Sequence, residues 1–324
     1  PDPAVTLQTA HHARLTLEAG ITTVRDVGSK NFIDIHVRDA VKTGLIPGPE
    51  IFCAGQMICI TGGHGHPLGC VADGPDEVRR AARKQVAAGV DWVKFMATGG
   101  VLSKGGKPGI PQLTLDELRA GIEEAHKLGP KTCAHSQGLE GTRNAVFAGI
   151  DSIEHGVSLD DEIIEEMVKR GVFLVPTFSA PANILTKGTE FGIPAEFVVK
   201  TKRLAEAHAA GVARAREAGV KIVMGTDAGT PFNYHGENAS ELVHLVEYGF
   251  SPHEAIICST SRAAQLLGVE DTLGAILPGL RADLLIVKGN PLEDISMLAD
   301  KERIWAVYQN GRVVKGLGEA FCGG

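Results

Sequence analysis

The sequence has no long hydrophobic run. No apolar stretch among its 324 residues approaches the roughly 20 residues that a membrane-spanning helix requires. The opening residues, Pro1 to Ala4, show no basic-then-apolar signal pattern. A membrane is therefore not an expected partner. Aromatic residues are also scarce, at 5% of the chain, which argues against a broad aromatic platform for a substrate.

Tracts of like charge are missing as well. The formal net charge of −7 comes from acidic and basic residues that are dispersed along the chain. Because no cluster of Lys and Arg could follow a phosphate backbone, nucleic acid is not an expected partner.

The cysteines do not form a metal-binding or redox pattern. None belongs to a CxxC pair, and several lie inside apolar runs, where a free thiol behaves as a small hydrophobic side chain. This usage predicts a reduced, cytoplasmic setting, while an even cysteine count in a long chain also permits disulfides. The six positions are Cys53, Cys59, Cys70, Cys133, Cys258 and Cys322.

The chain does have a regular alternation of short apolar runs and amphipathic stretches. Seven runs have the composition of buried parallel strands, at residues 21–27, 50–54, 92–97, 131–135, 151–155, 172–178 and 221–227. Amphipathic stretches with helical spacing lie at residues 4–19, 75–88, 114–128, 139–148, 160–170, 195–218, 238–248 and 252–267. The alternation predicts an α/β fold, a (β/α)8 TIM-like barrel. Because the chain opens on a helix, the first of the eight strands is expected to be missing from it.

Cap residues predict where several helices begin and end. Thr114 followed by Glu117 has the pattern of a capping box at a helix start. Glycines that follow a helix and precede a strand suit the left-handed position after a helix end. These glycines are Gly20, Gly89, Gly129, Gly149 and Gly219.

The composition changes after residue 270. Strand-like runs at 273–287, 304–309 and 312–315 are separated by Pro-Gly, Gly-Asn-Pro and Asn-Gly turns. The pair Asn310-Gly311 is a strong hairpin signal. We therefore expect two parts, a barrel at residues 1–270 and a small β-sandwich-like appendage at residues 271–324.

Four of the predicted strands carry a potential metal ligand at their ends, namely Lys94, His135, His155 and Asp227. Because the carboxyl ends of parallel barrel strands meet at one face, these side chains are expected to converge at one mouth. A single histidine in such a place is more often structural than a ligand. The combination nevertheless favours a metal-dependent hydrolase. An unmodified lysine is a poor ligand, because its ammonium has no lone pair.

The motifs around these residues resemble the amidohydrolase superfamily. They are WVKFMATGG, AHSQG, SIEHG and GTDAG, together with the tail GAILPGLRADLLIVKGNPLEDI. The resemblance is to the imidazolonepropionase-like and prolidase-like branch, which includes Xaa-Pro dipeptidases. It implies that Lys94 is carbamylated and bridges two zinc ions per subunit, that His135 and His155 bind one zinc, and that Asp227 binds the other. Asp227 would also be the catalytic residue that carries a proton from the attacking water to the leaving amine.

The implied activity is hydrolysis of a C–N amide bond by metal-activated hydroxide. The expected partner is a small molecule, a dipeptide or an N-acyl amino acid, as for a Xaa-Pro dipeptidase or carboxypeptidase. Hydrolysis of a cyclic amide, in the manner of imidazolonepropionase, is the alternative within the same enzyme class.

One feature departs from the family pattern. The family takes two further ligands from a His-x-His motif that ends the first strand, and this chain has no counterpart there. His11-His12 is adjacent rather than alternate and lies on a predicted helix, whereas His64-Gly65-His66 has the spacing but follows a later strand. We therefore expect an N-terminally truncated chain, without the first strand and the early strands of the appendage. A native chain that lacked the motif would be an inactive barrel scaffold.

Residues in loops beside the strand ends are candidates for substrate contacts. His64 and His66 lie in a glycine-rich loop, and Tyr234 and His235 follow the last predicted barrel strand. Each of them could equally bond backbone groups of its own loop. Gln137 stands where related members carry a second histidine, so it bears on the choice of substrate. A homo-oligomer is expected as well, since a truncated appendage exposes a sheet edge.

Overall fold

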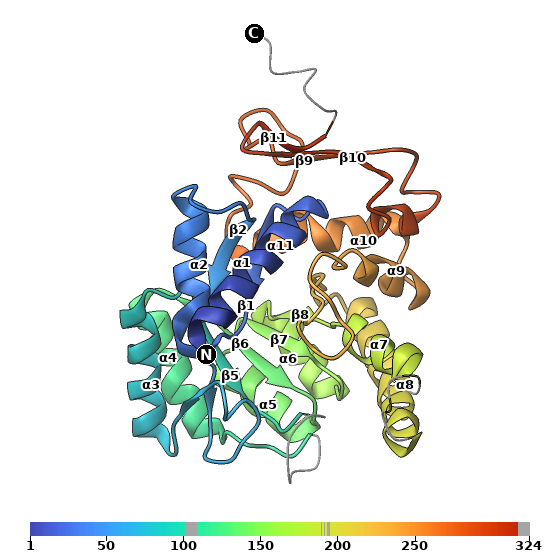
Figure 1. The fold of residues 1–324 in the computed structure, drawn as a ribbon. Helices are drawn as coiled ribbons and strands as arrows, with labels where there is room; N and C mark the ends of the chain where they lie inside the picture. The colour runs from blue at the N-terminus through green and yellow to red at the C-terminus, as the bar shows by residue number, and fades with distance from the viewer. Residues whose placement is uncertain (101–108, 189, 191, 193–194, 317–324) are drawn as a thin grey trace.

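Parallel strands form the inner layer of the computed structural model, which describes residues 1–100, 109–188, 190, 192 and 195–316 (Figure 1). They form a two-stranded sheet, β1-β2, and a six-stranded sheet in the order β4-β3-β5-β6-β7-β8. Each neighbouring pair runs parallel. The strands are β1 (Thr23–Asp26), β2 (Glu50–Cys53), β3 (Ile58–Cys59), β4 (Cys70–Val71), β5 (Trp92–Met96), β6 (Lys131–Ser136), β7 (Ser152–His155) and β8 (Phe173–Val175).

The two sheets are joined at Asp91. Its N–H donates to the Cys53 carbonyl over 2.9 Å, and its carboxylate accepts from the Cys53 N–H over 2.8 Å, so β2 lies beside β5. All residues of β5 are buried, as expected for a parallel strand that is covered on both faces. The strands therefore form one arc, which is the α/β barrel architecture that the alternation predicts.

The predicted strand at 221–227 is only partly present. Ile222 forms an isolated parallel bridge with Leu174 of β8, and the Val223 N–H donates to the Leu174 carbonyl over 2.9 Å. On the other side of the segment, the Met224 N–H donates to the Cys258 carbonyl of α10 (Pro252–Ser259) over 3.0 Å. The segment therefore continues the arc at Ile222 and Val223 but is not a regular strand over the whole of 221–227.

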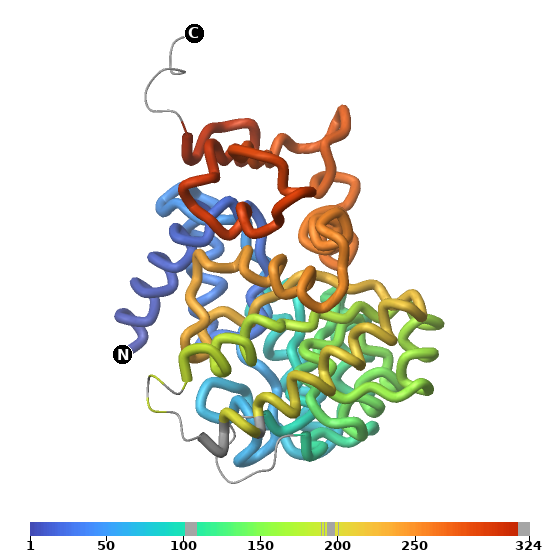
Figure 2. Tube along the Cα trace, turned by 90° about the vertical axis from the view of Figure 1, so that its right-hand side faces the viewer, coloured from blue at the N-terminus to red at the C-terminus, as the bar shows by residue number. Residues whose placement is uncertain are grey.

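Helices cover the strands on the outside of the arc (Figures 1 and 2). The predicted helices at 75–88 and 139–148 match α3 and α5. Helices α2 and α7 have no counterpart among the predicted stretches. The helices are α1 (Asp2–Glu18), α2 (Ile33–Lys42), α3 (Pro75–Ala88), α4 (Leu115–Leu128), α5 (Leu139–Ala148), α6 (Asp161–Arg170), α7 (Ser179–Lys187), α8 (Ala195–Glu217), α9 (Ser240–Glu247), α10 (Pro252–Ser259) and α11 (Ser261–Leu267).

The single helix predicted at 252–267 is wrong, because the chain forms two helices there. Thr260, between α10 and α11, has φ −122° and ψ −99°, which is not helical. Its hydroxyl donates to the Ile256 carbonyl over 2.6 Å. A threonine that bonds locally to the backbone in this way competes with regular helix formation.

The predicted cap residues are confirmed. The Glu117 N–H donates to Thr114 Oγ1 over 3.3 Å, and the Thr114 N–H donates to the Glu117 carboxylate over 2.8 Å, which completes the capping box of α4. The glycines predicted after helix ends all have positive φ angles, 92° at Gly20, 90° at Gly89, 115° at Gly129, 97° at Gly149 and 97° at Gly219. Gly89 and Gly149 are left-handed helical caps, whereas Gly129, with ψ −38°, lies outside that region.

The C-terminal segment forms an antiparallel sheet of β9 (Leu284–Val287), β10 (Ile304–Gln309) and β11 (Arg312–Lys315), in the order β11-β10-β9. Strands β10 and β11 have the predicted bounds, and β9 covers only the end of the run predicted at 273–287. The hairpin at Asn310-Gly311 is confirmed, since both residues have positive φ, 53° and 73°. The described residues of the predicted appendage thus form one three-stranded sheet.

This sheet lies at one end of the barrel, beside the N-terminal ends of β1 and β2 (Figures 1 and 2). The Gln309 amide donates to the Thr22 carbonyl over 3.0 Å, and Arg281 forms an ion pair with Glu50. The carboxyl ends of the strands, where barrel enzymes place their sites, lie at the opposite end.

All five cysteines in the described part of the chain are free thiols, and Cys322 lies outside it. Burial raises the pKa of Cys133 to about 11, so this thiol stays protonated and packs as a small apolar group. Within the described ranges, every helix is too short or too polar to span a bilayer.

Candidate active site

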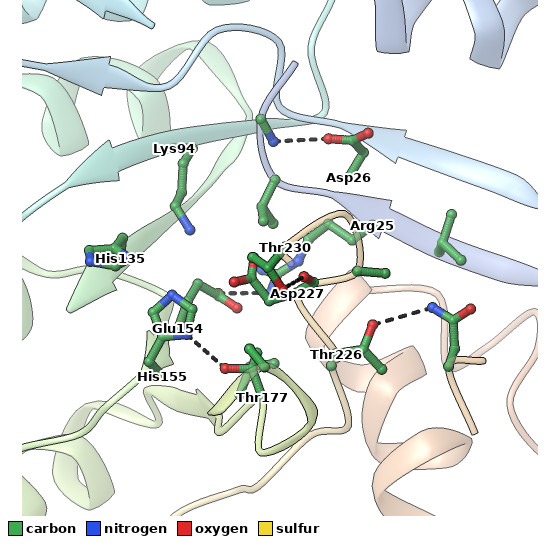
Figure 3. A pocket seen from close by; sticks show the side chains of 18 of the residues that line it. Arg25, Asp26, Lys94, His135, Glu154, His155, Thr177, Thr226, Asp227 and Thr230 are labelled. Carbon is green, nitrogen blue, oxygen red and sulfur yellow. Dashed lines mark hydrogen bonds and ion pairs between the residues drawn. The ribbon is translucent and has the colours of Figure 1, made fainter. Parts of the chain in front are cut away.

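A cavity of about 710 Å³ opens among the carboxyl ends of the strands. Its wall includes the four predicted ligand residues, which come from β5, β6, β7 and the segment after β8 (Figure 3). Lys94 projects from β5 toward the space between His155 and Asp227. The structure therefore brings together the side chains that the sequence singles out.

His135 and His155 lie against each other in this wall. Their ring centroids are 4.6 Å apart, and the ring of His64 lies 4.4 Å from that of His135. Burial, together with nearby His155, His64 and Lys94, holds the pKa of His135 well below its usual range. Burial and Lys94 lower the pKa of His155 in the same way. Both imidazoles are therefore neutral, the form in which histidine binds metal.

Asp227 lies opposite the histidines and has a strained backbone. Its φ is 55°, and His155 and Thr177 also have left-handed φ angles, 69° and 56°. Such angles are uncommon for residues other than glycine and are concentrated at functional sites. Burial raises the pKa of the Asp227 carboxyl to about 6 against the opposing effect of Lys94.

The side chains at the cavity include one nitrogen donor without a partner. His135 Nε2 is buried and has no hydrogen-bond partner, and a buried ring nitrogen of this kind fits coordination to a cation. Among residues 1–100, 109–188 and 195–316, no group of three or more His, Cys, Asp and Glu side chains is arranged to hold a metal ion. A site at this place therefore depends on Lys94 as well, and the four-residue metal site stays a prediction.

The predicted substrate contacts divide into two groups. His64 and His235 line the cavity, and His235 stacks on His12 of α1 with ring centroids 4.4 Å apart. His66 and Tyr234 are not part of the lining. The His66 ring accepts a hydrogen bond from the Gly62 N–H over 3.2 Å, and Tyr234 is 56% exposed. The geometry thus favours His64 and His235 as contacts for a substrate.

Several lining residues have no place among the sequence predictions. Arg25 of β1 forms an ion pair with Glu154 of β7 over 2.8 Å and donates to Ser152 Oγ over 2.9 Å. Beside it, burial and the charge of Asp34 raise the pKa of Asp26 to about 7. The sequence contains one sign of this pair, since ionisable residues lie inside two apolar strand runs, TTVRDVG and SIEHG. A charge that is buried in such a run needs a partner of opposite charge.

Comparisons with known proteins agree with this arrangement. A family model described as "Amidohydrolase family" matches residues 4–314. An ochratoxinase of Aspergillus niger is 33% identical over 93% of this chain and 67% of its own length. A crystal structure of a Xaa-Pro dipeptidase with methionine bound in its active site has 37% sequence identity and a TM-score of 0.89, covering 96% of this chain and 79% of that one. A prolidase complexed with N-methylphosphonate-L-proline has 31% identity and a TM-score of 0.90, covering 98% of this chain and 81% of that one.

Proposed function

The chain belongs to the amidohydrolase family and is a hydrolase of C–N bonds. From this premise we propose that it cleaves the amide bond of a dipeptide or an N-acyl amino acid in a metal-dependent reaction. The observation that carries the proposal is the meeting of Lys94, Asp227 and two neutral histidines in one cavity at the strand ends. The similarity to a Xaa-Pro dipeptidase, to a prolidase and to ochratoxinase supports an amide substrate with a free carboxylate on the leaving amine.

Lys94, His135, His155 and Asp227 are the residues of this chain that would contribute to a two-zinc site; the other two ligands of the family pattern, a first-strand His-x-His, have no counterpart in it. Lys94 would do so as a carbamate, because its ammonium form has no lone pair to donate. When bound, zinc supplies a Lewis acid for the scissile carbonyl and lowers the pKa of water to roughly 7.

The chain's own residues then direct the proton and the substrate. The Asp227 carboxylate accepts the proton of the attacking water and transfers it to the leaving nitrogen, so that the products are an acid and an amine. Asp227 lines the cavity and is half-buried there, so its carboxylate is within reach of a substrate. His64, which lies against His135 and lines the cavity, would contact the substrate.

The cavity wall formed by α7 and α8 indicates which side chains a substrate would carry. Most of its lining residues are apolar, namely Ala180, Pro181, Ile184, Leu204 and Ala205, and α8 also contributes the polar residues Thr201 and His208. An apolar wall of this kind binds apolar side chains and rejects charged ones, because a charge would lose its hydration there.

We expect Leu204→Asp to lower kcat/KM for substrates with an apolar side chain by about 10- to 200-fold, the range that apolar pocket contacts govern. The loss should lie mainly in KM, because Leu204 lies in the wall and not among the reacting groups. Leu204→Met keeps the volume and is the matched control. Equal losses for apolar and basic substrates would contradict an apolar subsite on α8.

Metal removal tests the proposed function as a whole. We expect elemental analysis to find zinc when the protein is prepared with bicarbonate, and less without it, because the Lys94 carbamate forms from carbon dioxide; two zinc ions per chain are expected where the first-strand His-x-His is also present. Chelation should abolish hydrolysis of a panel of dipeptides and N-acyl amino acids, and zinc should restore it. Turnover of a cyclic amide alone would support the ring-hydrolase alternative. Failure to bind zinc, with no turnover of any amide, would support the inactive scaffold.

A further inference from the structure

We propose that Thr177 is a positioning residue that keeps the hydrogen of the His155 imidazole on Nδ1 and so leaves the lone pair of Nε2 free to bind metal. The inference rests on the proposed function, in which His155 is a ligand. It concerns a residue outside the predicted ligand set. Figure 3 shows the contact between the two side chains at the edge of the cavity.

The hydrogens that Thr177 and its two neighbours can donate determine which nitrogen of His155 is protonated. Thr177 Oγ1 lies 2.7 Å from His155 Nδ1 and 2.6 Å from the Pro176 carbonyl oxygen. A carbonyl oxygen can only accept, and a threonine hydroxyl has one hydrogen to give. That hydrogen goes to Pro176, because two oxygens 2.6 Å apart with no hydrogen between them would repel. Thr177 Oγ1 must therefore accept from Nδ1–H, and a neutral imidazole that carries its hydrogen on Nδ1 has none on Nε2.

The hydroxyl is held in place by buried contacts on the far side. Thr177 itself has a left-handed backbone, with φ 56°. The next two residues bind Glu241 of α9, a fully buried carboxylate that accepts from the Phe178 N–H over 2.8 Å and from the Ser179 N–H over 2.7 Å. The Ser179 hydroxyl donates to the same carboxylate over 2.6 Å. These bonds fix the turn that presents the Thr177 hydroxyl to His155.

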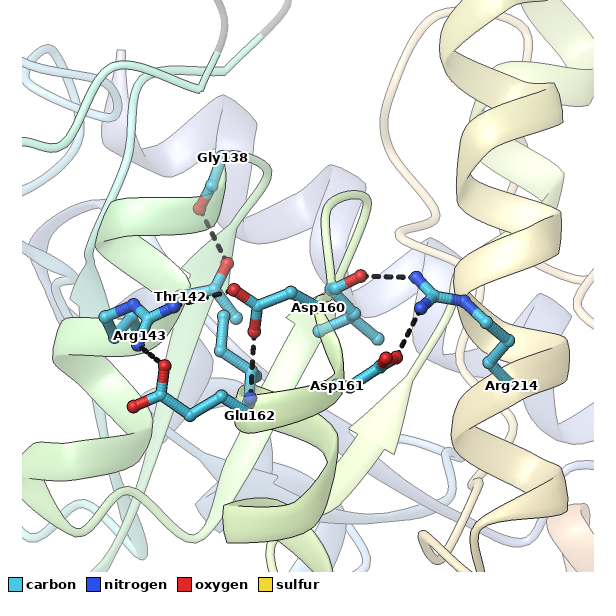
Figure 4. Close-up of polar contacts among 9 residues, drawn as sticks. Gly138, Thr142, Arg143, Asp160, Asp161, Glu162 and Arg214 are labelled. Carbon is cyan, nitrogen blue, oxygen red and sulfur yellow. Dashed lines mark hydrogen bonds and ion pairs between the residues drawn. The ribbon is translucent and has the colours of Figure 1, made fainter.

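The backbone of His155 is held separately, by helix α8. His208 Nε2–H donates to the His155 carbonyl over 2.7 Å. Further along α8, Arg214 donates to the Leu159 carbonyl over 2.6 Å and forms an ion pair with Asp161 over 2.7 Å (Figure 4). The loop after β7 therefore keeps its path without help from Thr177. Removal of the hydroxyl is expected to change the tautomer of the ring rather than the course of the chain.

Nuclear magnetic resonance of metal-free protein labelled with ¹⁵N-histidine measures the tautomer directly. The His155 signals are assigned by their loss in His155→Gln. We expect wild type and Thr177→Ser to carry hydrogen on Nδ1 of His155, because both keep the hydroxyl. In Thr177→Val, which keeps the branched shape, a share of the molecules should move the hydrogen to Nε2. Zinc affinity, measured by competition with a chelator, should fall about 10- to 100-fold in Thr177→Val, as is usual when the partner of a ligating histidine is lost.

The outcomes separate this inference from the proposed function. A wild-type spectrum with hydrogen on Nε2 of His155 would overturn the inference without recourse to any variant. A folded Thr177→Val protein with the tautomer and the zinc affinity of wild type would do the same. If wild type carries hydrogen on Nδ1 but binds no zinc, the tautomer assignment is supported and the metal-dependent function is what fails.

Discussion

Asp227→Asn is expected to lower kcat for amide hydrolysis by about 10²- to 10⁴-fold, the contribution that a positioned proton-transfer group makes. The amide has the shape of the carboxylate but cannot take a proton from water at neutral pH. Asp227 lies at the cavity, opposite Lys94 and the histidines, so the lost function is chemical and not a matter of distant packing. Initial rates on a dipeptide, measured at saturating substrate with zinc present, give the ratio.

Two controls test whether the lost rate is due to proton transfer by Asp227. Asp76→Asn removes the same charge from α3, where the side chain is 90% exposed, and should leave kcat unchanged. Zinc content of Asp227→Asn, measured on the same sample, separates loss of the proton carrier from loss of a metal ligand. An Asp227→Asn enzyme with full zinc and a kcat within threefold of wild type would show that another group moves the proton.

The sequence was sufficient to predict elements whose stability is local or repetitive. Strands such as β5 are buried on both faces and therefore read as continuous apolar runs. Capping boxes and glycine caps depend on a few neighbouring residues, so Thr114 and Glu117 could be recognised by spacing alone. The segment at 221–227 forms only an isolated bridge to β8, and its Met224 N–H donates to Cys258 of α10, a contact between distant parts of the chain that no local pattern contains.

The residues of the candidate site likewise divide into those that the sequence pattern predicts and those that it does not. Lys94, His135, His155 and Asp227 could be singled out because each stands at or near the end of an apolar run. The ion pair that lines the same cavity could not be predicted. Arg25 and Glu154, which form it, lie 129 residues apart in the chain. Pairing of that kind depends on which strands become neighbours across the barrel, and the pattern of a single strand does not contain it.

Arg25→Leu is expected to lower the free energy of unfolding by about 3–5 kcal/mol, because it leaves the Glu154 carboxylate buried without its counter-charge. The side chains of Arg25 and Glu154 are only 8% and 5% exposed, so water is a poor replacement for the lost partner. The guanidinium also lies 4.5 Å from the centre of the Trp92 ring, and this contact would be lost too. Urea unfolding followed by circular dichroism measures the change.

Removal of both charges should be less harmful than removal of one. In a double variant, Arg25→Leu with Glu154→Leu, neither member of this pair is left as an unpaired charge, so part of the lost stability should return. Arg119→Leu is the matched control, because its ion pair with Asp116 is solvent-exposed, with side chains 45% and 79% accessible, and should cost less than about 1 kcal/mol. If Arg25→Leu were no more destabilising than Arg119→Leu, the carboxylate of Glu154 would have to become protonated or hydrated in the variant. Ser152, which donates to that carboxylate over 2.7 Å, would then be sufficient to satisfy it.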